Sequence, residues 1–374
     1  MKYTIAVTQQ CNLGCSYCYI SRNREVMSLE TADKIIEFMF HHTPEDETIE
    51  IGFFGGEPML EFELIKAISS RIRSHRGYNP DKVNFFIVSN GTIFSDAIAD
   101  ELLRLQLPFG ISCDGPPHIQ DTSRVFRDGR GSSTVVEKNI RYALRSFPFL
   151  PVNAVYTPNT LQHLPEVIDY FYALGVRVIY LNPDISARWT KEHAQMLPVL
   201  YRAVGEKYID YYKQETPCYI SMIDSKVTVI MRGGYQPLEK CRMGKGEFAF
   251  APSGNVYPCE RLIGSDDGVT HCLGNINSSN LTQVKCSHDA SQIANATCPS
   301  CELNQYCMNW CGCTNYFATG DYNAPGAFLC ASEKASIGVA LEVINTLGNE
   351  GIPFSDHLAG TPLMSIIGES VLKG

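Results

Sequence analysis

YTIAVTQQCNLGCSYC, residues 3–18, joins a short apolar run to three closely spaced cysteines. Its first part, Tyr3–Val7, is typical of a short buried strand. In a fold built of parallel strands and crossover helices, the loop after the carboxyl end of a strand is where binding sites lie. We therefore expect an α/β domain with a cysteine site directly after its first strand.

The first half of the chain repeats a strand–helix unit. Apolar runs that predict strands alternate with stretches of helical periodicity. The further strands are predicted at 48–54, 83–89, 109–112, 151–156 and 176–181, and the helices at 28–42, 63–75, 95–105, 134–146 and 165–174. This alternation is typical of parallel strands with crossover helices. Six strands are too few for a closed eight-stranded barrel, so the sequence predicts an open, partial (β/α)6 TIM-type barrel.

Four regions are expected along the chain. Residues 1–182 form the predicted barrel, and residues 183–235 form a helical connection. Residues 236–330 have short elements and many cysteines, which indicates a small domain held by metal. Residues 331–374 return to a helix, which is followed by a tail that Gly and Pro interrupt.

Composition limits the possible functions. The chain has 374 residues, 44% of them hydrophobic, which excludes an intrinsically disordered protein. A formal net charge of -9 argues against binding nucleic acid or an anionic membrane. No apolar run approaches the roughly 18 residues of a membrane span. The first residues do not resemble a signal peptide, so a cytoplasmic protein is expected. In a reducing cytosol, fifteen cysteines favour metal or cluster ligation over disulfides.

The three cysteines of the opening stretch, Cys11, Cys15 and Cys18, are called the catalytic set below. Three thiolates can hold three irons of a cubane cluster and leave the fourth iron open to a small molecule. Zinc is the weaker interpretation, because zinc sites usually pair two C-x2-C units or add histidine. Glycine motifs end the next three predicted strands: Gly55-Gly56-Glu57-Pro58, Ser89-Asn90-Gly91-Thr92 and Ser112-Cys113-Asp114-Gly115-Pro116. Each alone would be an ordinary turn, but their order after successive strands indicates one shared site.

Together these motifs resemble the signature of the radical S-adenosylmethionine (SAM) enzymes. The resemblance implies that the catalytic set holds a [4Fe-4S] cluster whose open iron binds SAM. Reduction of that cluster then cleaves SAM to a 5'-deoxyadenosyl radical, which abstracts a hydrogen atom. It also implies SAM-binding residues in all four motifs: Tyr17, Gly55, Gly56, Glu57, Pro58, Asn90, Ser112 and Asp114. The glycines would allow close backbone approach, and the Glu57 carboxylate would pair with the ammonium group of SAM.

A second cysteine pattern reads Cys241-x12-Gly254-x4-Cys259, Cys298-x2-Cys301-x5-Cys307-x3-Cys311 and Cys330. It resembles the SPASM extension of radical SAM enzymes that modify peptides and proteins. The resemblance implies two auxiliary [4Fe-4S] clusters, and so three clusters in all. A distal set would be Cys298, Cys301, Cys307 and Cys330, and a near set would be Cys241, Cys259 and Cys311. The near set is one ligand short. Either a fourth thiol completes it, from Cys218, Cys272, Cys286 or Cys313, or one iron stays open to a substrate thiolate.

Length and layout are similar to those of the anaerobic sulfatase-maturating enzymes, which oxidise a Cys or Ser of another protein to formylglycine. That family has Gln where this chain has Phe54, and an Asp base where this chain has Glu260. Glu260 is the candidate proton-transfer residue, although it could instead pair with Arg261 or a nearby lysine.

The sequence thus predicts a radical SAM oxidoreductase that modifies a ribosomally made peptide, with formation of a thioether or carbon–carbon cross-link. Formylglycine formation is the alternative. A non-catalytic Fe–S electron carrier is the alternative of another class, and the glycine motifs argue against it because a carrier needs no SAM pocket. The expected partners are a precursor peptide or protein and a reductant such as flavodoxin or ferredoxin. Because residues 1–10 hold only the first strand, a separate peptide-recognition protein is a further expected partner.

Overall fold

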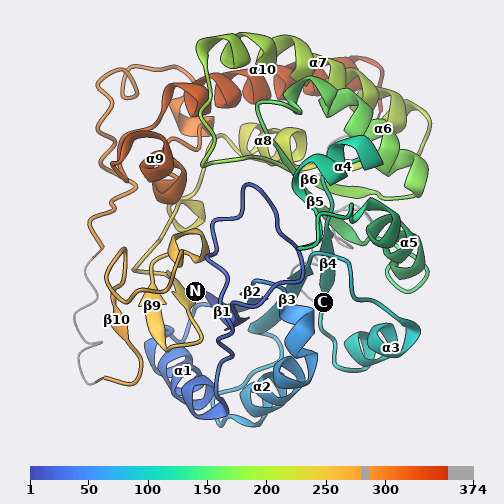
Figure 1. The fold of residues 1–374 in the computed structure, drawn as a ribbon. Helices are drawn as coiled ribbons and strands as arrows, with labels where there is room; N and C mark the ends of the chain where they lie inside the picture. The colour runs from blue at the N-terminus through green and yellow to red at the C-terminus, as the bar shows by residue number, and fades with distance from the viewer. Residues whose placement is uncertain (279–285, 353–374) are drawn as a thin grey trace.

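The computed structural model describes residues 1–278 and 286–352 (Figure 1). A ten-stranded sheet runs through it in the order β10-β9-β8-β1-β2-β3-β4-β5-β6-β7. Strands β1 to β7 pair in parallel, β8 pairs in parallel with the free side of β1, and β8, β9 and β10 pair antiparallel. The strands span Lys2–Thr8 (β1), Ile49–Gly55 (β2), Val83–Ser89 (β3), Phe109–Ser112 (β4), Pro151–Tyr156 (β5), Val178–Pro183 (β6), Tyr219–Ile220 (β7), Glu247–Phe250 (β8), Asn255–Tyr257 (β9) and Gly274–Asn275 (β10).

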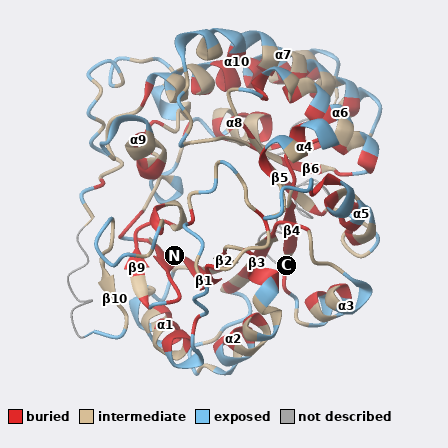
Figure 2. Cartoon of the chain, in the orientation of Figure 1, coloured by how far each residue is buried: buried red, intermediate tan, exposed pale blue. Residues whose placement is uncertain are grey.

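Helices surround the sheet, and their buried residues lie mostly on the sides turned inward (Figure 2). They span Leu29–His42 (α1), Phe62–Ser74 (α2), Asp96–Arg104 (α3), Pro117–Ser123 (α4), Ser133–Ala143 (α5), Leu164–Leu174 (α6), Lys191–Lys213 (α7), Ser221–Met231 (α8), Gly312–Thr319 (α9) and Ala327–Asn349 (α10). Serine hydroxyls cap two of the crossover helices: Ser28 accepts the N–H of Thr31, and Ser95 accepts that of Ile98. In the described residues, no helix is both long and apolar enough to cross a membrane.

The predicted partial barrel is confirmed, with its six strands and five crossover helices close to their expected bounds. Three features were not predicted. Helix α4 follows the fourth strand, and β7 extends the sheet within the connection expected to be helical. The C-terminal helix begins at Ala327 rather than at residue 331, so Cys330 lies on it. The predicted tail lies outside the described residues from residue 353 on.

The cysteine-rich region is joined to the barrel through β8. The register runs from Lys2 opposite Glu247 to Ile5 opposite Phe250. The ring of Tyr3 stacks on Phe248 at 6.1 Å between centroids. The first four residues of β1 therefore pair with the cysteine-rich region on one side and with β2 of the barrel on the other.

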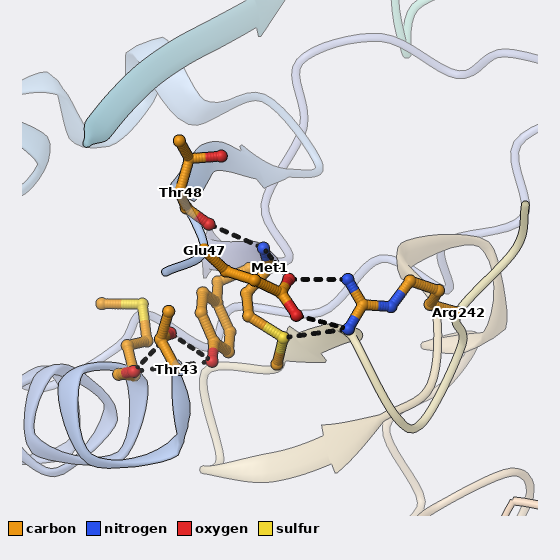
Figure 3. A network of polar contacts seen from close by, with 7 residues as sticks. Met1, Thr43, Glu47, Thr48 and Arg242 are labelled. Atoms are coloured by element: carbon orange, nitrogen blue, oxygen red, sulfur yellow. Dashed lines mark hydrogen bonds and ion pairs between the residues drawn. The ribbon is translucent and has the colours of Figure 1, made fainter. Parts of the chain in front are cut away.

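A second junction lies beside the near set. Both terminal nitrogens of Arg242 donate to the Glu47 carboxylate, at 2.6 and 2.9 Å (Figure 3). The Met1 amino group donates to the same carboxylate at 3.2 Å and to the carbonyl of Thr48 at 2.6 Å. Chiefly because of the hydrogen bonds from Arg242, the pKa of Glu47 is lowered to about 2. These hydrogen bonds link Glu47, in the segment after α1, to Arg242, the residue that follows Cys241.

The distal set is held by a buried ion pair between α8 and α10. The Lys226 ammonium lies 2.6 Å from the Glu333 carboxylate, and the two side chains are 2% and 9% exposed. Lys226 also donates to the carbonyl of Tyr306 at 3.1 Å. The pair therefore links the loop that carries Cys307 to the helix that carries Cys330.

Candidate functional site

A cavity of about 300 Å³ opens inside the partial barrel, where the loops after its strands converge. Ten of the predicted site residues line it: Cys11, Cys15, Tyr17, Cys18, Gly55, Gly56, Glu57, Asn90, Ser112 and Glu260. Pro58 and Asp114 are not among the lining residues; Pro58 starts a buried 3-10 turn, and Asp114 lies behind the wall. The lining also includes Lys2, Arg22, Phe54, Arg124, Asn153, Asn182, Asp184 and Arg261.

The two glycines at the end of β2, Gly55 and Gly56, contact the segment that leads into the catalytic set. The N–H of Gly56 donates to the Thr8 carbonyl at 2.9 Å, and that of Glu57 donates to the Gln10 carbonyl at 2.7 Å. A Cβ at residue 55 would lie 2.1 Å from the Thr8 carbonyl oxygen, and one at residue 56 would lie 2.2 Å from that of Gln10. Glycine is required here because the two backbones are in direct contact.

The Glu57 carboxylate is fully buried and accepts three hydrogen bonds. They come from the backbone N–H of Met59 at 3.0 Å, the Ser89 hydroxyl at 2.8 Å and the backbone N–H of Asn90 at 2.6 Å. Burial raises its pKa to about 6, and these bonds oppose the shift. A carboxylate has about four acceptor positions, so one is left for a further donor such as an ammonium group.

The Asn90 side chain supports the cysteine loop directly. Its amide donates to Asn12 at 2.8 Å and approaches the Cys11 sulfur at 3.7 Å, while its carbonyl oxygen accepts from Thr92. Asn12 in turn donates to the Thr92 hydroxyl at 2.8 Å. The loop after β3 thus positions the first cysteine of the catalytic set.

Asp114 acts behind the cavity wall as a shared acceptor. It accepts the Tyr17 hydroxyl at 2.6 Å, the Arg124 guanidinium at 2.9 Å and the Val155 N–H at 3.0 Å. Arg124 also lies over the Tyr17 ring, 5.4 Å from its centroid. Burial raises the pKa of the Cys15 thiol, and the Arg124 charge opposes that rise. Arg124 was missed from sequence because no motif contains it.

The opposite wall comes from the cysteine-rich region and the start of β1. The Lys2 ammonium lies 2.7 Å from Glu247 and 3.5 Å from Glu260. Burial alone would raise the pKa of Glu260, but Lys2 and Arg261 hold it below its ordinary value. A carboxylate with a lowered pKa is a weak general base. Lys2 was missed because only the long-range pairing of β1 with β8 brings it here.

The distal set lines a second cavity, of about 260 Å³. All four of its thiols face this space, and none of the fifteen cysteines forms a disulfide. Four unpaired thiols around one cavity are the donor set that a [4Fe-4S] cluster requires. The near set lies in a small buried group with Met243, Leu262 and Cys313. The distal set therefore fits the cluster that the sequence pattern implies, and the near set has its three cysteines together in one group.

Comparison with known proteins agrees with this geometry. Residues 5–184 match the model of the radical SAM superfamily. The uncharacterized protein MJ0907 of Methanocaldococcus jannaschii is 31% identical over 292 residues, which cover 76% of this chain and 92% of that protein.

Two solved structures share the fold. The structure of anSMEcpe with bound AdoMet and Cp18Cys peptide has a TM-score of 0.77 at 19% identity, over 93% of this chain and 99% of that one. The structure of Streptococcus suis SuiB bound to its precursor peptide SuiA has a TM-score of 0.58 at 15% identity, over 88% and 75%. The matches cover the partial barrel and the cysteine-rich, SPASM-type domain together. This chain belongs to the radical SAM superfamily.

Proposed function

We propose that the protein is an oxidoreductase that uses SAM to modify a residue of a ribosomally made peptide, with formation of a thioether or carbon–carbon cross-link. One observation carries the proposal. A single cavity is lined both by the catalytic set with the glycine motifs and by the charged residues beside the near set. A peptide side chain in this space would lie between the two kinds of cysteine site.

The two groups of lining residues would have different roles. When bound, the clusters and SAM would supply a hydrogen-abstracting radical and a path for the electron that the substrate loses. The catalytic set would hold the first cluster, and Glu57 has an acceptor position left for the ammonium group of SAM. Lys2, Glu260 and Arg261 would orient the polar groups of the peptide. The charges of Lys2 and Arg261 would also keep Glu260 ionised.

Formylglycine formation is the second candidate, since the anSMEcpe structure shares this fold over almost the whole chain. Two features of the cavity weigh against it. Phe54 lines the cavity and stacks on Tyr19 at 6.1 Å, where the sulfatase-maturating pattern has a polar glutamine. The Glu260 carboxylate lies 3.5 Å from the Lys2 ammonium, so this ion pair competes with a role as the base for the proton that such an oxidation must release.

Mass spectrometry of a co-expressed peptide tests the proposal. The protein is produced with small peptides encoded next to its gene and with flavodoxin or ferredoxin as reductant. A cross-link removes two hydrogen atoms from the peptide, resists an aldehyde-reactive hydrazide, and joins two residues in the fragment spectrum. A product that reacts with the hydrazide would support formylglycine formation instead. A dependence on a separate peptide-recognition protein is tested by adding one to the same reaction. The cytoplasmic location expected from the sequence stays a prediction.

A further inference from the structure

Four thiols, rather than three, meet at the start of α9. The Cys311 and Cys313 sulfurs are 3.9 Å apart. Cys313 also packs with Cys259 in the same buried group. Cys241 packs against the same group, beside Gly312, the residue between the two cysteines of this C-x-C turn. Every member of the near set therefore touches Cys313 or its immediate neighbours.

The turn has this shape because residue 312 is glycine. Cys311 is the extended N-cap of α9, and Gly312 and Cys313 are its first two residues. A Cβ at residue 312 would lie 2.3 Å from the Met243 sulfur and 2.9 Å from a ring nitrogen of His288. Without a side chain there, the turn packs directly against the segment that carries Cys241.

Positive charge is placed beside these thiols. Arg261 approaches the Cys313 sulfur at 4.0 Å, and Lys2 lies on the far side of Cys259, paired with Glu247 and Glu260. Thiolates that bind iron carry negative charge, and cations nearby favour that form. The Arg261 guanidinium therefore lies where its charge would stabilise a Cys313 thiolate.

Of the other cysteines that could complete the near set, Cys218 and Cys272 lie elsewhere, whereas Cys286 packs at the edge of the same group but makes other contacts. Cys218 precedes β7, at the opposite edge of the sheet, and its sulfur donates to the carbonyl of Tyr219. Cys272 donates to the carbonyl of Gly274 at 3.2 Å, at the start of β10. Cys286 packs against Gly244, and its sulfur accepts the backbone N–H of His288.

We propose that Cys313 completes the near set as its fourth thiol ligand, so that no iron of that cluster stays open to a substrate. The inference rests on the auxiliary clusters of the proposed function but not on the identity of the peptide. A closed cluster can accept an electron but offers no place for a substrate thiolate. Of the two cross-links proposed above, the carbon–carbon bond is then favoured.

Besides Glu260, which adjoins Cys259, two residues that are not cysteines could compete for the same iron. The Glu247 carboxylate lies within 4.8 Å of the Cys259 sulfur and of Glu260. His288 packs against Gly312, and its Nε2 is buried without a hydrogen-bond partner among the described residues. Substitutions at both positions therefore belong in the test.

The test uses a chain that lacks the catalytic cluster, with Cys11, Cys15 and Cys18 changed to Ala. After anaerobic reconstitution it should hold about eight irons, four for each auxiliary cluster. In this background we compare Cys313→Ser with the matched control Cys286→Ser, and with Glu247→Gln and His288→Gln. Iron content and the electron paramagnetic resonance (EPR) spectrum of the reduced protein are measured with and without 2-mercaptoethanol.

The proposal expects the background spectrum to be insensitive to the added thiol. Cys313→Ser should change the spectrum or lower the iron to about four per chain, whereas the three other variants should match the background. The proposal would be overturned if Cys313→Ser had the same iron content and the same spectrum as the background chain. It would also be overturned if 2-mercaptoethanol changed the spectrum of the background chain itself. If the background holds only about four irons, the near cluster is absent and the auxiliary part of the proposed function fails as well.

A second measurement leaves Cys313 in place, in case its substitution prevents folding. The unmutated chain is alkylated with iodoacetamide before and after iron chelation. The denaturant concentration is set so that Cys113, a buried thiol outside all three sets, just begins to react. Cys313 should be protected only in the iron-loaded protein, together with the near set. Equal alkylation of Cys313 in both forms, with the near set protected, would contradict the proposal.

Discussion

The catalytic set and the near set are both groups of cysteines next to β1, but they are built differently. The catalytic set has three thiols on a loop after the strand, and Cys18 is exposed. The near set lies with Cys313 in a buried group, beside Lys2 at the start of the same strand. Three thiols, of which Cys18 is exposed, would leave an iron for a ligand, whereas four thiols, of which Cys259 and Cys313 are buried, would enclose a cluster. In our proposal, this contrast separates a site for SAM chemistry from a site for electron transfer.

Removal of the catalytic set should have the largest effect. In the chain with Cys11, Cys15 and Cys18 changed to Ala, SAM cleavage should be abolished, and about a third of the roughly twelve irons should be lost. Iron analysis and chromatography of 5'-deoxyadenosine after dithionite reduction measure both. Residual SAM cleavage by this variant would assign the chemistry to another cluster and remove the contrast.

A change in the support of the catalytic loop should almost match that effect. In Gly56→Ala, the new methyl group would lie 2.2 Å from the Gln10 carbonyl oxygen, so the loop must shift. We expect SAM cleavage to fall at least ~100-fold, as displacements near 1 Å can cause, while the auxiliary iron is retained. Gly338→Ala is the matched control, because a Cβ at this position in α10 has no neighbour within 4 Å. Normal activity of Gly56→Ala would mean that the close contact is not needed.

The catalytic loop was more accessible to sequence analysis than the opposite wall, for a physical reason. Parallel strands bring their carboxyl ends to one edge, so local motifs after β1, β2, β3 and β4 predict a shared site without knowledge of the packing. Asn90 and the two glycines line the cavity in agreement with this logic. Asp114 follows the same strand order but supports Tyr17 and Arg124 from behind the wall.

The opposite wall depends on contacts between residues far apart in the chain. Lys2 meets Glu247 across 245 positions, and only the pairing of β8 with β1 shows this. Cys313 differs, because the C-x-C spacing with Cys311 is local and visible. From the spacing alone, Cys313 was no better a candidate for the fourth ligand than three other cysteines. The contact with Cys259, from a distant segment, distinguishes it.

Disruption of the buried ion pair should affect the cysteine-rich side alone. Lys226→Met leaves the Glu333 carboxylate buried without its partner, which should lower the free energy of unfolding by about 3–5 kcal/mol. Denaturant titration of the iron-free chain measures this loss. The double variant Lys226→Met with Glu333→Leu should recover much of it, since no charge is then left unpaired. An equal loss in single and double variants would show that packing, not charge, sets the stability there.

The smallest effect concerns the junction between the two regions. The pKa of Glu47 is about 2 in the folded chain and near 4.5 ordinarily, so its carboxylate stabilises the fold above about pH 4.5. That contribution should be lost as the pH falls from 4.5 towards 2. Urea unfolding of the unmutated chain and of Glu47→Gln should differ at pH 6 and converge at low pH. A constant difference across this range would rule out the ion pair with Arg242 as its source.

The contrast between an open and a closed cluster is tested most directly by EPR of the reduced protein with and without SAM. Spectra are recorded for the unmutated chain and for the chain with the catalytic set changed to Ala. SAM should shift the signal of the unmutated chain and leave that of the variant unchanged, because only the catalytic set leaves an iron to which SAM can bind. A SAM-dependent shift in the variant, or none in the unmutated chain, would contradict the account.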